Sequence, residues 1–174
     1  MKKYFHQLAA QRADFFTEYQ DVNVWSRAQP NKWSIAETLY HLLLLLKRFR
    51  QLNVIYLPMA RPLSTLRRNR PYKTASVNIY EQYNQKHLKA MKAPSIIMPP
   101  KNIQQQVSYN EMIQMLEQET AYLSMLVAEI DEDVAGHIRY PDPPAHYPNL
   151  IQAIHLLVIH EQHHFTICRK IDFK

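Results

Sequence analysis

Three histidines near the end of the chain, His160, His163 and His164, fall within little more than one turn of a helix. At about 100° per residue, His164 lies about 40° from His160, whereas His163 lies about 60° away on the other side. The first two fall beside the apolar positions Leu157 and Cys168, and His163 leans towards the polar face. Two imidazoles one turn apart on an inward face can chelate one ion, so this spacing predicts a metal site.

Such a pair needs a further ligand from another helix, and His41 can supply it. His41 shares one face of an apolar segment with Leu45 and Phe49, because residues four apart are neighbours on a helix. Three neutral imidazoles with an open fourth position form a catalytic zinc-type site, and nickel or iron also accepts them. We therefore expect His41, His160 and His164 to bind one divalent ion, with zinc and nickel the leading candidates. The alternative is core histidines satisfied by hydrogen bonds.

Glu161 falls inside the same apolar stripe, about 100° from His160, and a buried carboxylate needs a partner. One interpretation is that it orients a metal-binding imidazole through a hydrogen bond. The other is a buried salt bridge or a hydrogen bond to a loop. The angular separation from His160 favours the second interpretation.

Long helices must position these residues. Capping boxes at Ser34–Glu37 and Ser108–Glu111 mark two helix starts. After residue 52, three prolines predict an irregular stretch: Pro58, Pro62 and Pro71. Apolar spacing predicts four long helices and one shorter helix, over residues 2–20, 34–52, 108–130, 149–169 and 76–92.

Glycine occurs once in 174 residues, against about a dozen expected from average usage. Tight hairpin turns and phosphate-binding loops need glycine, so we expect an all-α fold, with residues 1–174 forming a single domain. Cys168 is the one cysteine, which excludes an intramolecular disulfide and a thiolate cluster, and its place on the stripe predicts a packing residue. The first residues do not form a signal peptide, and residues 42–46, the longest apolar run, cannot span a membrane. These features predict a cytoplasmic protein without a membrane partner.

Positive charge is concentrated in the middle of the chain. Residues 47–101 carry twelve Lys or Arg and one acid, a net charge of +11, while the remainder carries −5. Such a field favours anionic ligands, although a solvated face without a partner is the alternative. Tyr72 lies near these basic residues in the sequence, as an aromatic residue in a nucleic-acid site would. Nucleic acid is nevertheless disfavoured as a partner, because no recognised binding motif surrounds the basic residues. The candidates for binding an anionic ligand are Arg61, Arg67, Arg68, Arg70 and Lys73.

Residues 32–42 (KWSIAETLYHL) and 160–164 (HEQHH) resemble motifs of the DinB-like (damage-inducible) superfamily of metal-binding four-helix bundles. The resemblance covers essentially the whole chain and maps the metal triad of the family onto His41, His160 and His164. It implies an up-down-down-up topology, in which the basic middle segment is a long crossover between the second and third helices.

The resemblance also implies a function. Relatives include metal-dependent transferases that join a low-molecular-weight thiol, such as bacillithiol, to an electrophile. A thiol at an open metal position loses its proton more easily, so the nucleophilic thiolate exists at neutral pH. The basic crossover would then hold the carboxylates of that thiol.

Other functions stay open at this point. A hydrolase could use a metal-bound hydroxide, and a metal-binding stress-response protein would have no turnover at all. An ergothioneine sulfoxide synthase is disfavoured, because Thr166 stands where that branch has a glutamate and a second domain is missing. The expected partner is a small-molecule substrate or thiol, and the oligomeric state, a homodimer included, is open.

Overall fold

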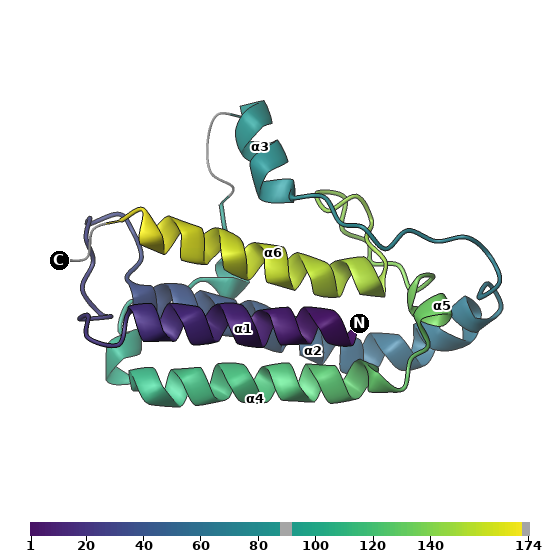
Figure 1. Ribbon diagram of the computed structural model, residues 1–174, viewed down its shortest axis with the longest axis horizontal. Coiled ribbons are helices and arrows are strands. Elements are labelled where there is room, and N and C mark those ends of the chain that lie inside the picture. Colours follow the sequence, from purple (N-terminus) through teal and green to yellow (C-terminus); the bar gives the residue numbers. More distant parts are fainter. Residues whose placement is uncertain (88–91, 172–174) are drawn as a thin grey trace.

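The computed structural model describes residues 1–87 and 92–171, and within them the chain is helical and contains no β-strand. The prediction of an all-α fold is therefore confirmed. Four long helices, α1, α2, α4 and α6, lie side by side along the longest axis of the molecule (Figure 1). The elements are α1 (Lys2–Glu18), α2 (Ile35–Thr65), α3 (Ile79–His87), η1 (Ser95–Ile97), η2 (Ile103–Gln105), α4 (Tyr109–Ala128), α5 (Glu132–Ala135) and α6 (Leu150–Arg169).

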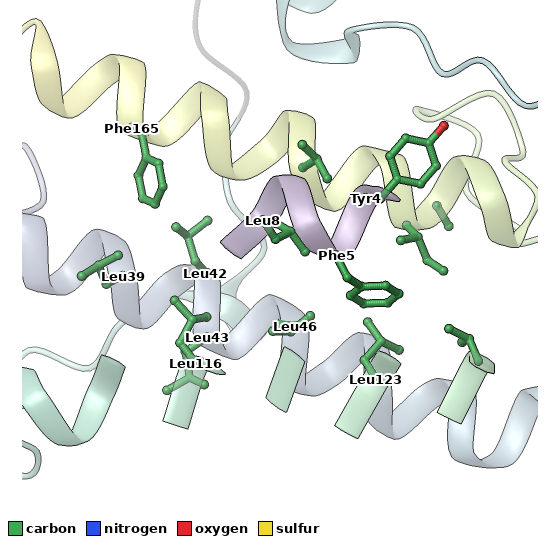
Figure 2. Close-up of a cluster of buried hydrophobic side chains, with 14 of the residues drawn as sticks. Tyr4, Phe5, Leu8, Leu39, Leu42, Leu43, Leu46, Leu116, Leu123 and Phe165 are labelled. Atoms are coloured by element: carbon green, nitrogen blue, oxygen red, sulfur yellow. The ribbon is translucent and has the colours of Figure 1, made fainter. Parts of the chain in front are cut away.

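The core lies between the four long helices. α1 packs against α6 and α4, and α2 packs against the same two helices. Figure 2 shows Leu8 of α1, Leu43 of α2 and Leu116 of α4 among the buried side chains, each 1% exposed. Phe165 of α6 stacks on Phe15 of α1, with ring centroids 3.9 Å apart. Burying each side chain of this size stabilises the fold by about 1.5–3 kcal/mol.

Both predicted capping boxes are present. At the start of α2, the amide of Glu37 donates to the hydroxyl of Ser34 at 3.1 Å, and the amide of Ser34 donates to the Glu37 carboxylate at 2.8 Å. Ser108 and Glu111 form the same reciprocal pair at the start of α4. These bonds fix where both helices begin. On α2 the cap therefore also sets which residues of the following turns face the core.

α2 is longer than the sequence pattern predicts. The spacing predicts an end near Leu52, but the helix continues to Thr65 through Pro58 and Pro62. Both prolines lie on the exposed face, where water can satisfy the carbonyl oxygens that lose an intrahelical donor. On another face of the same turn, Leu57 is buried in the core. The prediction was wrong because this packing outweighs the local cost of the two prolines.

The middle of the chain leaves the layer of long helices. α3 lies outside them, on the side of α6 (Figure 1). The helix predicted over 76–92 begins three residues later, as α3 (Ile79–His87), and residues 88–91 of the prediction lie outside the described residues. The acidic run after α4 leads into the short helix α5. In the part of the chain that the structure describes, no helix is long and apolar enough to cross a membrane.

Candidate metal centre

The structure brings His41, His160 and His164 together from two helices. His41 lies in the second turn of α2, whose first turn is held by the Ser34 cap. His160 and His164 lie one turn apart near the end of α6, whose N-cap is Asn149. The start of α2 therefore lies against the end of α6, and the three imidazoles meet between them.

The three rings point their Nε2 atoms at one another. Nε2 of His160 lies 3.2 Å from Nε2 of His41 and 3.0 Å from Nε2 of His164, and one nitrogen from each ring falls within 4.8 Å of the others. Three imidazoles around a tetrahedral zinc ion, with bonds of about 2.0–2.1 Å, place their nitrogens about 3.3 Å apart. The observed spacing fits three ligands of one ion.

A main-chain carbonyl sets the tautomer of His41. The carbonyl oxygen of Ile97 can only accept, so Nδ1–H of His41 donates to it at 2.8 Å. Nε2 of the neutral ring then presents its lone pair to the other two histidines. Nε2 of His160 lies beside this nitrogen and beside Nε2 of His164, and whichever tautomer His160 and His164 adopt, only one of the two contacts can be a hydrogen bond. A cation at the centre would satisfy all three rings.

Burial keeps the rings neutral. Burial, together with the neighbouring His164, His41 and His163, lowers the pKa of His160 well below its ordinary value. Burial also lowers the pKa of His41, and burial with His41 and His163 nearby lowers the pKa of His164 to about 3. The neutral imidazole is the form that binds a metal, so the centre can accept an ion at neutral pH.

Two aromatic side chains flank the centre. The ring centroid of Trp33 lies 4.9 Å from that of His41 and 6.4 Å from that of His164. Tyr80, at the start of α3, stacks on His160 at 5.3 Å. These rings cover part of the imidazoles and so add to the burial that is the main cause of their lowered pKa values.

A groove of about 820 Å³ runs beside the centre, between α1, α3 and α6. Tyr80 and His163 line it, and His163 stacks on Tyr80 at 4.5 Å. The volume falls in the range of small-molecule sites. The three histidines do not line the groove, but Tyr80 contacts His160 and His163 contacts His164. The groove also carries five carboxamide side chains, those of Gln7, Gln11, Asn78, Asn84 and Gln162.

Glu161 follows His160 in sequence but belongs to a different cluster. Its carboxylate accepts hydrogen bonds of 2.7–3.0 Å from Nε and Nη2 of Arg12, and one of 2.7 Å from Gln11. Nη1 of Arg12 donates to Thr120 at 2.7 Å. Among residues 1–87 and 92–171, no histidine is hydrogen-bonded to this carboxylate. Glu161 therefore forms a buried salt bridge with Arg12, which is one of the alternatives that the sequence left open.

The basic residues predicted to bind an anion lie away from the centre. Arg61 follows His41 by twenty residues on α2, which is about 30 Å of helix rise, and it donates to a main-chain carbonyl at the end of α4. Arg68 is paired with Asp131 and Asp133 at 3.2 and 2.8 Å. The acidic run thus neutralises part of the basic segment. The other three candidates are exposed: Arg67, Arg70 and Lys73.

Two contributors to the centre escaped the sequence pattern. Ile97 acts through its main-chain carbonyl, which leaves no signal in the side-chain sequence. Tyr80 reaches His160 only because the crossover folds back over α6, and no periodicity records that contact. For Trp33, the signal was its place in the motif of residues 32–42.

The sequence matches one known protein family over most of its length. The sequence profile of the DinB superfamily matches residues 7–168. That span begins inside α1, ends inside α6 and contains all three histidines. No curated protein and no solved structure matches this chain.

Proposed function

The chain belongs to the DinB superfamily, and from that premise we propose that it is a metal-dependent thiol S-transferase. Its ligands for one divalent ion, zinc or nickel, are His41, His160 and His164. The substrates are a low-molecular-weight thiol of the bacillithiol type and an electrophilic small molecule. The thiol sulfur forms a bond to carbon, the leaving group departs with its bonding electron pair, and the thiol proton passes to solvent. The ion supplies a Lewis-acid position that lowers the pKa of the thiol.

The convergence of the three Nε2 atoms carries this proposal. Two helices position the rings, Ile97 fixes one tautomer, and burial keeps the rings neutral. Among the described residues the cluster offers three protein ligands. Catalytic zinc sites use three protein ligands and keep an open position, whereas structural sites use four.

The chain's own cysteine is a poor candidate for the nucleophile. Cys168 is 2% exposed, and burial raises the pKa of its thiol to about 11. A thiol in that state is neither accessible nor ionised at neutral pH. The sulfur must therefore come from a substrate, and the groove beside Tyr80 and His163 offers space for one.

We further propose that the four long helices form the up-down-down-up bundle that the resemblance implies. In Figure 1 the colours along α1 and α6 progress from right to left, whereas those along α2 and α4 progress from left to right. A short connection, 19–34, joins α1 to α2, while residues 66–108 join α2 to α4. Only the longer connection has to return along the whole bundle.

A conjugation assay tests the proposed activity. Metal-loaded protein is mixed with bacillithiol, glutathione, cysteine or coenzyme A and a chlorinated nitroaromatic. We expect conjugation with at least one thiol, its loss in metal-stripped protein and in His160→Ala, and its retention in Cys168→Ala. If metal-loaded protein conjugates none of the four thiols, the transferase proposal fails and the metal-binding stress-response protein remains. Conjugation that survives in stripped protein would show that the histidine centre is not responsible.

A further inference from the structure

A second pocket, of about 500 Å³, lies where residues 73–79, the loop 139–148 and the first turns of α6 meet. Its lining residues differ from those of the groove, and the first turn of α3 separates the two. Three hydrogen bonds fasten one wall to α6. Asn149 donates to the carbonyl of Lys73 and Gln152 donates to that of Ala75, each at 2.6 Å, while Ser76 donates to the carbonyl of Gln152 at 3.0 Å. The pocket is thus formed before any ligand enters.

The ionisable side chains that line this pocket are all basic. Lys73, Arg139 and His146 line it, and none of its lining residues is Asp or Glu. The acids on the neighbouring elements are Asp142 in the loop and Glu81 in α3, and Glu81 lines the groove on the other side. The twenty-residue helix α6 also begins at this pocket, and its N-terminal dipole adds to the positive potential.

Hydrogen-bond donors remain for a ligand. A guanidinium carries five N–H donors, and for Arg139 the structure assigns one bond, from Nη1 to the carbonyl of Tyr147 at 3.1 Å. The ammonium of Lys73 has no hydrogen-bond partner among the residues that the structure describes. By contrast, Arg68 is already paired with Asp131 and Asp133. Of the five basic candidates named from the sequence, Lys73 alone lines this pocket.

The remaining lining combines the polar residues Ser76, Gln82 and Gln152 with apolar side chains. Ala145 and Pro148 are buried, and Ile79 and Leu156 contribute aliphatic surface. The volume exceeds that of an inorganic anion and falls within the range of small-molecule sites. We propose that this pocket binds a small molecule that carries a carboxylate or phosphate on an apolar body, held by Lys73 and Arg139. The proposal requires neither a bound metal nor the transferase activity.

Isothermal titration calorimetry at constant ionic strength tests the proposal. The probes are benzoate, phenyl phosphate, inorganic phosphate and, as the neutral counterpart, benzamide. We expect wild-type protein to bind benzoate or phenyl phosphate more tightly than inorganic phosphate, because the ring enters the apolar part of the pocket, and not to bind benzamide. Preference between benzoate and phenyl phosphate identifies the anionic group. Lack of binding of both at millimolar concentration would overturn the proposal.

Variants locate the site. Lys73→Gln and Arg139→Gln should each weaken binding about tenfold or more, the effect of losing one charge-assisted hydrogen bond. Arg67→Gln makes the same change of charge at an exposed arginine outside the pocket and should leave the affinity unchanged. Equal weakening in all three variants would mean a general charge effect and no site. Metal-free and metal-loaded protein should bind alike, whereas binding by the metal-loaded form alone would place the anion on the metal and contradict the proposal.

Discussion

His160 and Glu161 are neighbours on α6 and both are buried, yet they belong to two different polar clusters. The Glu161 carboxylate receives hydrogen bonds from α1, three of them from Arg12, so the folded chain supplies its partners. The Nε2 atom of His160 instead faces Nε2 of His41 and of His164. These three nitrogens cannot all be satisfied by one another.

The difference separates polar groups that find their partners within the fold from polar groups that the fold leaves without a complete set of partners. A buried polar group costs free energy unless it is paired. In the Arg12–Glu161 cluster both partners are protein side chains, so the cluster stabilises the packing of α1 on α6. In the histidine cluster the three imidazoles do not satisfy one another, and their arrangement could hold a cation.

Removing a histidine should have the largest effect on metal binding. His160→Ala should weaken the affinity for the ion by more than about a hundredfold, because loss of an outer hydrogen-bond partner alone costs about 10–100-fold. The same is expected for His41→Ala and His164→Ala. His163→Ala, on the same helix but stacked on Tyr80, is the matched control and should keep wild-type affinity. Competition with a chromophoric chelator measures all four, and wild-type affinity in a triad variant would remove that residue from the ligand set.

Breaking the other cluster should affect stability more than metal binding. Arg12→Met leaves the Glu161 carboxylate buried without its main partner and should lower the free energy of unfolding by about 3–5 kcal/mol. Urea unfolding of metal-free protein measures this loss, and chelator competition on the folded variant should still find one bound ion. The double variant Arg12→Met/Glu161→Leu should recover much of the stability. If Arg12→Met lost the metal without losing stability, Glu161 would orient the histidines and the contrast between the clusters would fail.

The histidine cluster should also make stability depend on pH. The ordinary pKa of a histidine is 6.5, whereas that of His164 in the folded chain is about 3. As the pH falls below 6.5, the unfolded chain takes up a proton that the folded chain excludes. The contribution of His164 to the free energy of unfolding is therefore fully present above pH 6.5. It is lost as the pH falls towards 3, by up to about 1.4 kcal/mol per pH unit.

Urea unfolding of metal-free wild-type protein and His164→Ala, between about pH 7 and pH 5, measures that contribution. The wild type should lose more stability over this range than the variant, because the variant lacks one of the protons taken up on unfolding. Parallel loss in the two proteins would mean that His164 is not kept neutral by the fold.

The smallest effect is expected at Cys168, one turn beyond His164 on α6. Its side chain is buried but is not part of either polar cluster. Cys168→Ala should cost about 1 kcal/mol of stability through lost packing and should leave metal affinity unchanged. A tenfold or larger loss of affinity would bring the thiol into the metal centre and overturn its assignment as a packing residue.

The two clusters also show which parts of the site could be predicted from the sequence. Capping boxes and helical periodicity predicted the inward faces that carry His41, His160 and His164, because both are local properties of the chain. The same reasoning placed Glu161 inside but could not choose its partner, because Arg12 comes from a helix some 150 positions away, and only packing brings it close. The end of α2 was mistaken for the same reason: its prolines act locally, whereas Leu57 is held by the core.

X-ray absorption spectroscopy of the purified protein, combined with elemental analysis, tests the central claim most directly. We predict about one zinc or nickel ion per chain, with three imidazole nitrogens about 2.0–2.1 Å from it and one position taken by a lighter, exchangeable ligand. In His163→Ala the spectrum should be unchanged, and in His160→Ala the ion should be absent. Protein that takes up no divalent ion, even after incubation with zinc and nickel, would contradict the account.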